Sequence, residues 1–204
     1  MKKIILMAIA CFVSLFSYAE TADAIFNKTL SAYKSAKGLA VKYSMTGSAG
    51  NASGEIAMQG NKFCITSSNM ICWYNGKTQW SYSTMSNEVS IMEPTANELQ
   101  IVNPMLVISN FQKSYTATLG KSSSATASVI ILKPKNAKTA QYSSVALTVN
   151  KKTYLPSKII ATLKDKSKIT ISLSGYKTGC NFPASTFVYD KKYVPAGVQV
   201  VDLR

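Results

Sequence analysis

The chain contains no histidine and a single arginine, Arg204. Without imidazole it lacks the usual general base, the most common zinc ligand and every catalytic triad that depends on histidine. Its nine acidic residues stand singly along the 204 residues, and nothing in their spacing suggests a glycosidase pair. We therefore expect no catalytic residue, no metal site and no cofactor.

The positive charge comes almost entirely from lysine, and the formal net charge is +14. Lysine is a flexible point charge, whereas bidentate recognition of phosphate and guanine favours arginine. We therefore expect no nucleic-acid partner. The lysines are spread along the chain, which leaves two interpretations: a generally basic, solvated surface, or loose attraction to anionic lipid headgroups.

Long apolar runs are absent beyond the N-terminus. Met1, Lys2 and Lys3 precede an apolar run over residues 4–16, and small residues then lead to Ala19. This pattern predicts a signal peptide over residues 1–19, because the run is shorter than the roughly 20 residues of a membrane span. The alternative, a lipoprotein cleavage box ending at Cys11, would strand apolar residues on the mature end. Residues 20–204 are expected to form one exported domain.

Cysteine is scarce in the predicted mature chain, which keeps Cys64, Cys72 and Cys180. No C-x-x-C spacing exists, so thioredoxin-like chemistry is not expected. Folding residues 62–74 as a hairpin about Ser68 sets Cys64 opposite Cys72. That register predicts either a disulfide, in an oxidising compartment, or two free thiols on one strand face.

Two short motifs resemble those of penicillin-recognising serine enzymes. Residues 31–34 fit S-x-x-K through Ser31 and Lys34, and residues 177–179 fit K-T-G. The third motif of those enzymes is missing, and the chain is rich in serine and lysine. We interpret the matches as coincidence, since a hydrolase would need Ser31 and Lys34 on a buried pocket wall.

Hydrophobic periodicity predicts one helix followed by many strands. Residues 23–37 repeat apolar side chains at helical spacing, with Thr21 or Asp23 as a cap and Gly38 as a stop. The period then changes to two. Strands are predicted over residues 41–46, 55–59, 62–66, 70–74, 79–83, 88–92, 127–133, 142–150, 158–164 and 168–174, with a last extended piece near 187–189.

The strand pattern is interrupted after Pro94. Thr95 and Glu98 form a capping-box signature, Pro104 ends or kinks that helix, and residues 105–111 read as a second short helix. The predicted fold is mainly β (α+β): an incomplete, strongly curved antiparallel barrel of about 10 or 11 strands. Two or three helices cover its open side.

Large or flexible apolar side chains are abundant at positions that the pattern places inward. Methionine adapts to irregular ligands, so the set as a whole predicts a lipid-binding cavity, although each residue taken alone is better explained as part of a core. The candidates are Met45, Met58, Phe63, Trp73, Trp80, Tyr82, Ile91, Leu99, Met105, Ile108 and Phe111.

Residues 75–82, Asn-Gly-Lys-Thr-Gln-Trp-Ser-Tyr, followed by residues 87–94, resemble the LolA-like outer-membrane lipoprotein carrier family. The resemblance implies a monomeric periplasmic chaperone whose barrel, closed by helices, shelters the acyl chains of lipoproteins or another lipid. It also implies an inner-membrane releasing complex and an outer-membrane acceptor as partners. A lipid-sensing or protein-interaction domain of the same fold is the alternative.

One departure from the family pattern concerns the helical lid. Well-known carriers of the family have an arginine after the second strand that hydrogen-bonds to the lid and holds it shut. Here Gly60 or Asn61 occupies that place, and Arg204 is the only arginine. The resemblance therefore implies a lid without this lock, or with a different one.

Overall fold

The computed structural model describes residues 20–48 and 50–204, apart from the side chains of residues 100–102 and 105. The predicted signal peptide, residues 1–19, lies outside this range. Within the described residues, no helix is long and apolar enough to cross a membrane.

The first helix, α1 (Ala22–Ser35), matches the helix predicted over residues 23–37. Thr21 caps its start: the Thr21 hydroxyl oxygen accepts a hydrogen bond from the backbone N–H of Ala24 at 3.2 Å. Its apolar stripe, which includes Ile25, Phe26 and Leu30, is almost fully buried against the sheet. Amphipathic periodicity therefore both forms the helix and orients it.

All strands belong to one twelve-stranded sheet in the order β12-β6-β5-β4-β3-β2-β1-β11-β10-β9-β8-β7. Neighbouring strands pair antiparallel, except that β12 runs parallel to β6. The strands are β1 (Leu39–Gly47), β2 (Ala52–Gln59), β3 (Lys62–Ser67), β4 (Met70–Tyr74), β5 (Gln79–Ser83), β6 (Glu88–Met92), β7 (Tyr115–Leu119), β8 (Ala127–Pro134), β9 (Tyr142–Asn150), β10 (Pro156–Leu163), β11 (Lys168–Thr178) and β12 (Gln199–Asp202).

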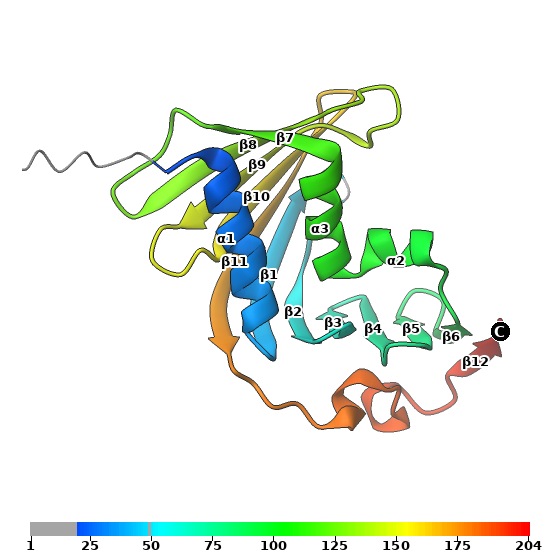
Figure 1. The fold of residues 1–204 in the computed structure, drawn as a ribbon. Helices are drawn as coiled ribbons and strands as arrows, with labels where there is room; N and C mark the ends of the chain where they lie inside the picture. The colour runs from blue at the N-terminus through cyan, green and yellow to red at the C-terminus, as the bar shows by residue number, and fades with distance from the viewer. Residues whose placement is uncertain (1–19, 49) are drawn as a thin grey trace, which may run out of the picture.

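The sheet is strongly curved and not closed, because β7 and β12 stand at its two ends without pairing to each other (Figure 1). The predicted incomplete barrel is thus confirmed. Two strands were not predicted, β7 and β12. No strand forms over the extended piece expected near residues 187–189. Residue 187 is instead the last residue of a 3-10 helix, η1 (Ala184–Phe187).

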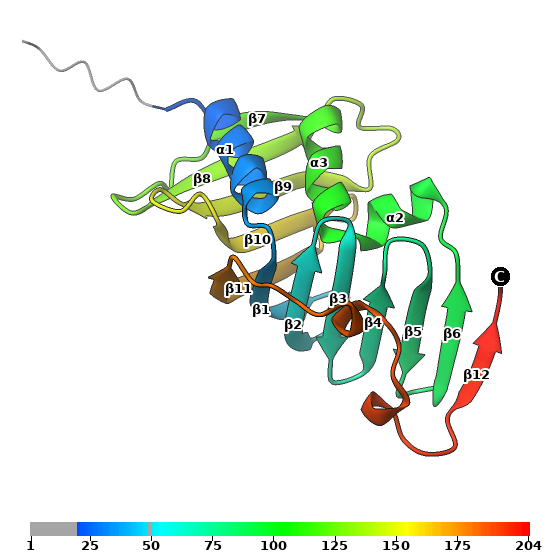
Figure 2. The same cartoon turned by 60° about the horizontal axis from the view of Figure 1, so that its bottom comes forward.

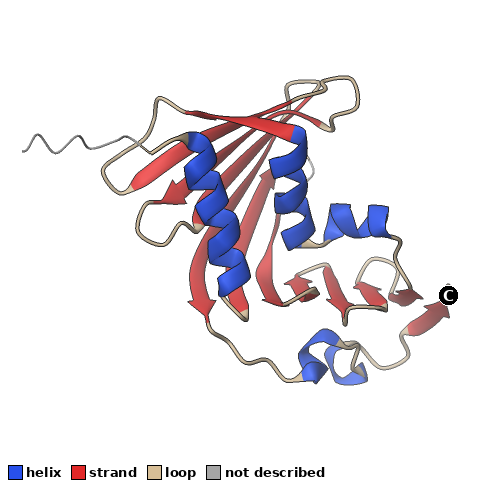
Figure 3. Cartoon of the chain, viewed as in Figure 1, coloured by secondary structure: helices blue, strands red, loops and turns tan. Residues whose placement is uncertain are grey.

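Three helices lie inside the curve of the sheet, on its concave face: α1, α2 (Ala96–Val102) and α3 (Pro104–Ser114) (Figures 1 and 3). The capping box predicted for α2 is present. The Thr95 hydroxyl accepts from the Glu98 backbone N–H, and the Glu98 carboxylate accepts from the Thr95 backbone N–H at 2.7 Å. Pro104 begins α3, where its missing N–H costs nothing.

The core lies between α1 and the concave side of β8, β9 and β10. Ile130, Val145 and Val149 are fully buried there, and Leu132 and Leu147 nearly so. Burial of each such side chain contributes roughly 1.5–3 kcal/mol. This cluster fixes α1 across the curve of the sheet.

Two tyrosines join the C-terminal half of α1 to the sheet. The hydroxyls of Tyr33 and Tyr176 are 3.0 Å apart, and Tyr176 donates to the carbonyl of Pro156 at 2.8 Å. Burial raises the pKa of Tyr33 to about 12, and it also raises the pKa of Tyr176. The neutral hydroxyls therefore form a continuous hydrogen-bonded link from α1 through β11 to β10.

The convex face is covered over β2 to β6 by residues 179–198, which we call the C-terminal strap (Figure 2). Phe187 of the strap and Trp73 of β4 are almost fully buried in the same cluster. The Trp73 ring also meets Tyr189 edge-on, with ring centroids 5.7 Å apart. The strap then continues into β12 at the sheet's end.

The register of the β3–β4 hairpin corrects the predicted cysteine pairing. Cys64 pairs with Trp73, and Cys72 pairs with Ile65, one residue away from the register predicted about Ser68. A shift of one residue moves a side chain to the opposite face. Cys64 therefore lies under the strap and Cys72 on the concave side, and both are free thiols. Of the two alternatives, the disulfide is contradicted, and the free thiols lie on opposite faces of the hairpin rather than on one.

Replacing Phe187 by alanine should loosen the strap, because a buried aromatic is lost and the cavity left behind costs about 3–5 kcal/mol. In a Cys180→Ser background, thiol labelling of Cys64 should accelerate at least tenfold relative to the parent. Cys72, on the other face, is the internal control and should stay protected. Equal acceleration of both thiols would instead indicate global unfolding and contradict a separately anchored strap.

Candidate functional site

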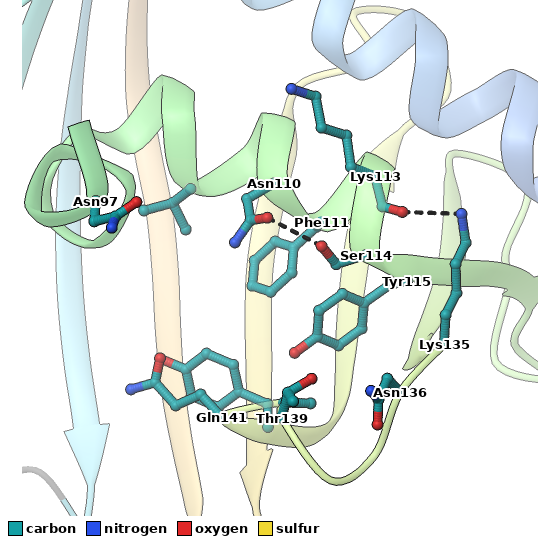
Figure 4. A pocket seen from close by; sticks show the side chains of 13 residues that line it. Asn97, Asn110, Phe111, Lys113, Ser114, Tyr115, Lys135, Asn136, Thr139 and Gln141 are labelled. Carbon is teal, nitrogen blue, oxygen red and sulfur yellow. Dashed lines mark hydrogen bonds between the residues drawn. The ribbon is translucent and has the colours of Figure 1, made fainter.

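A cavity of about 520 Å³ lies between the helices α2 and α3 and the β8–β9 connection (Figure 4). Among the residues that the structure describes, the lining combines aromatic, amide, hydroxyl and lysine side chains and includes no acid. It consists of Asn97, Val107, Asn110, Phe111, Lys113, Ser114, Tyr115, Lys135, Asn136, Thr139, Ala140, Gln141 and Tyr142. Asn97, Asn136 and Thr139 are exposed, so the cavity opens to solvent on their side.

Three aromatic rings form the apolar wall of the cavity. Phe111 of α3 meets Tyr115 of β7 edge-on, with ring centroids 5.0 Å apart, and lies 6.2 Å from the ring of Tyr142 in β9. Burial raises the pKa of both tyrosine hydroxyls. The wall therefore offers an apolar surface with neutral hydroxyl groups, which suits an amphipathic ligand.

The polar side chains of the cavity are amides and hydroxyls, which donate and accept hydrogen bonds, and two lysines, which only donate. The Asn110 side-chain oxygen accepts from the Ser114 hydroxyl at 3.1 Å, which leaves the amide N–H₂ of Asn110 for other partners (Figure 4). The Lys135 ammonium donates to the backbone carbonyl of Lys113 at 2.9 Å and so stabilises the C-terminal end of α3. With no carboxylate in the lining, a ligand rich in acceptor oxygens fits best.

We call α2 and α3 together the helical cover. Neutral amide side chains join this cover to the rest of the fold. Asn103, between α2 and α3, is 4% exposed, and its side-chain N–H₂ donates to the backbone carbonyl of Asn61 at 3.1 Å. Gln112 of α3 donates to the side-chain oxygen of Asn27 in α1 at 2.7 Å. One bond thus holds the cover to the β2–β3 turn and the other holds it to α1.

The Asn103 bond reaches the turn where the family resemblance places a locking arginine. Gly60 and Asn61 form that turn, as predicted, and Gly60 has a positive φ of 61°. The direction of the bond is reversed, because here the cover supplies the donor side chain and the turn supplies a backbone acceptor. The cover therefore has a lock built differently from the arginine lock.

The structure divides the predicted cavity residues between the two faces of the sheet. Met45, Met58 and Phe63 lie on the concave face, since Met58 pairs with Phe63 across β2 and β3. Leu99 and Ile108 of the helices pack on the same core, and Phe111 lines the cavity. The predicted cavity residue Met105 has a side chain outside the described part of the structure.

The four remaining candidates lie on the convex face, where they cannot contribute to this cavity. Trp73, Trp80 and Ile91 pair in one row across β4, β5 and β6, and Tyr82 shares their face, which the strap covers. Trp73 also lines a separate cavity of about 300 Å³ between β2–β4 and the strap. The prediction that these residues face inward with Met58 and Phe63 was wrong, because both faces of these strands are apolar.

Several cavity residues were not predicted from the sequence. Tyr115 begins a strand that was missed, and Asn110, Gln141 and Tyr142 lie on segments distant in sequence that only the fold brings together. One sequence feature could have indicated them: Gln141 and Tyr142, a polar and an aromatic residue, stand at the start of the strand predicted over residues 142–150. The S-x-x-K side chains Ser31 and Lys34, in contrast, are both exposed on α1.

The described residues thus form an open, curled sheet with a helical cover beside an amphipathic cavity. Residues 13–166 match the family model described as outer membrane lipoprotein carrier protein LolA. The chain therefore belongs to this family. A search of curated protein sequences finds no match.

Three solved structures to which the chain is similar are distant from it in sequence. An uncharacterized conserved protein from Thermus thermophilus is 10% identical, with a TM-score of 0.57 over 87% of this chain and 96% of that chain. MucB is 14% identical, with a TM-score of 0.50 over 88% of this chain and 65% of that chain. A LolA superfamily protein from Nitrosomonas europaea is 14% identical, with a TM-score of 0.40 over 86% and 100%.

Substituting Asn103 by alanine should weaken the hold on the cover. Losing this buried hydrogen bond costs about 1–2 kcal/mol, so amide hydrogen exchange in α2 and α3 should accelerate by roughly fivefold to thirtyfold. Exchange in β8 and β9 should not change. The exposed Asn97→Ala substitution in α2 is the matched control, and acceleration of the same size in that variant would contradict a lock at Asn103.

Proposed function

We propose that this protein is a periplasmic carrier that shelters the acyl chains of lipoproteins during transfer towards the outer membrane. The observation that carries the proposal is the cavity beside the cover helices, with its aromatic wall and its lining of lysine, amide and hydroxyl side chains. Its volume of about 520 Å³ lies in the range of roughly 300–1,000 Å³ typical of ligand sites. Membership in the lipoprotein carrier family supports the same proposal.

The physical task of a carrier fits the construction of the concave face. Exposing an acyl chain to water costs about 0.8 kcal/mol per methylene, so a lipid needs an apolar shelter on its way between membranes. Phe111 offers such a surface in the closed form. Movement of the cover, which neutral amide bonds hold, would add Leu99, Ile108 and the concave residues Met45, Met58 and Phe63 to the ligand surface.

The remaining parts of the proposal follow from the carrier role. A leader cleaved after about Ala19 would deliver the chain to the periplasm, and no enzymatic step is required. An inner-membrane complex would load the carrier and an outer-membrane acceptor would unload it. The acids and lysines of the sequence need no catalytic role in this scheme.

A protein-interaction or lipid-sensing role is the second candidate. Its support is the similarity in fold to MucB, of which this chain spans about two thirds. MucB also occurs in a complex with MucA in Pseudomonas aeruginosa. Under this alternative the outer surface would bind a partner protein, and filling the cavity would leave that binding intact.

Filling the cavity gives a direct test of the carrier role. Ala140 lines the cavity from the β8–β9 connection, so an Ala140→Trp side chain should occupy the space beside Phe111 and Tyr142. We expect native mass spectrometry of the mature protein, purified from its own envelope, to show bound lipid or lipopeptide that this variant lacks. Uptake of an added acylated peptide should fall at least about tenfold, which is 1.4 kcal/mol.

Ala137→Trp is the matched control, because Ala137 is exposed in the same connection and does not line the cavity. It should bind the acylated peptide like the parent protein. If parent and control take up no acyl ligand, the carrier proposal fails and the interaction role gains support. Unchanged uptake by Ala140→Trp would place the ligand elsewhere.

A further inference from the structure

The positive charge of the chain is concentrated in one half of the sheet. Residues 20–112 hold six lysines and six acids, whereas residues 113–177 hold twelve lysines and a single acid, Asp165. All twelve of these lysines are exposed. The excess charge therefore belongs to β7–β11 and their connections.

Antiparallel pairing gathers seven of these lysines at one end of those strands. The starts of β7, β9 and β11 lie beside the ends of β8 and β10, as the pairs Thr116–Lys133, Tyr142–Leu163 and Thr162–Lys168 show. We call this surface the basic end. It consists of Lys113, Lys133, Lys135, Lys138, Lys164, Lys166 and Lys168.

The loops of the basic end are joined to one another and to α3. The Lys164 ammonium donates to the carbonyl of Lys138 at 3.1 Å, and the Lys135 ammonium donates to the carbonyl of Lys113 at 2.9 Å. The β10–β11 turn, the β8–β9 connection and the end of α3 thus form one surface. The carboxylate of Asp165 accepts hydrogen bonds from Ser167 within its own turn.

The basic end is also the rim of the cavity. Lys113 and Lys135 belong both to the basic end and to the cavity lining, and Asn136 and Thr139 line the cavity from the connection that carries Lys135 and Lys138 (Figure 4). Behind them stand the rings of Phe111, Tyr115 and Tyr142. The cavity mouth therefore lies beside two lysines of the basic end, and aromatic side chains form its wall.

We infer that the basic end docks the protein on an anionic phospholipid bilayer, with the cavity opening towards the lipid. Anionic surfaces attract clustered lysines with about 1 kcal/mol for each lysine near the surface. Tyrosine is favoured at membrane interfaces, where its ring is apolar and its hydroxyl is hydrated. Lysine without arginine argues against nucleic acid or phosphopeptide, which favour bidentate arginine contacts.

This docking surface goes beyond the proposed carrier function, which requires only the cavity. The inference specifies which surface of the protein would contact the bilayer when a lipid enters or leaves the cavity. Charge–charge attraction would position the cavity mouth at the bilayer, and shelter of the acyl chain would follow as a separate step. The two steps can therefore be tested separately.

The test compares two triple variants that remove the same charge. Lys133, Lys138 and Lys168 are changed to glutamine at the basic end. Lys121, Lys152 and Lys177 are changed to glutamine at the opposite ends of the same strands. Binding of the mature protein is measured by co-sedimentation with vesicles of phosphatidylglycerol and phosphatidylcholine, and with vesicles of phosphatidylcholine alone.

We expect the parent protein to bind only the anionic vesicles, and to lose binding as salt screens charges beyond about 8 Å at physiological ionic strength. The basic-end variant should bind at least about tenfold more weakly, and the opposite-end variant within about twofold of the parent. Equal weakening of both variants would show that the charge acts diffusely and would overturn the inference. The inference would also be overturned if the parent protein did not bind anionic vesicles. It would likewise be overturned if duplex DNA, added at the same molar concentration of negative charge as the lipid, displaced the protein from the vesicles.

Uptake of an acylated peptide in vesicle-free solution separates this inference from the proposed function. The basic-end variant should keep that uptake. Acyl uptake without vesicle binding by the parent would overturn the docking surface and leave the carrier function standing. Vesicle binding without acyl uptake would do the reverse.

Discussion

The packing of α1 across the concave face is the contact on which the rest of the structure depends. A curved sheet that does not close leaves a wide apolar surface that must be covered. Ile25, Phe26 and Leu30 cover it over β8–β10, and the Tyr33–Tyr176 link extends the contact towards β11. Because α1 fills one part of the curve, α2 and α3 need to cover only the remainder.

This division means that α1 is held on the sheet more strongly than α2 and α3 are. The contact of α1 rests on almost fully buried side chains such as Ile25, Phe26 and Leu30. The later helices contribute half-buried apolar side chains, and the amide bonds of Asn103 and Gln112 join them to the turn and to α1. Local stability in proteins varies in this way, and movable covers are drawn from the weaker part. The cavity lies under that weaker cover, beside Phe111.

The sequence predicted the main features of the fold but not the composition of the site. The period-two pattern and the capping box at Thr95 and Glu98 are local signals, and both were sufficient for ten of the strands and the start of α2. Short strands such as β7 and β12 have weak patterns. The cavity depends on contacts between Phe111, Tyr115 and Tyr142, which no local pattern encodes.

The sequence also could not predict which face of the sheet each set of side chains occupies. Alternation shows which residues share a face, and it placed Trp80, Tyr82 and Ile91 together correctly. It could not show which face is concave, because the strap makes the convex side apolar as well. The predicted β3–β4 register was wrong for a related reason: a turn placed one residue away puts Cys64 and Cys72 on opposite faces instead of on the same face.

The lock at Asn103 has a consequence for sequence variation, because its acceptor is the backbone carbonyl of Asn61. An ion pair or a side-chain pair ties two positions together, so a change at one demands a change at the other. Here any residue that keeps the conformation of the β2–β3 turn supplies the same acceptor. Substitutions at position 103 therefore change this bond directly, whereas a substitution at position 61 that keeps the turn conformation keeps the acceptor.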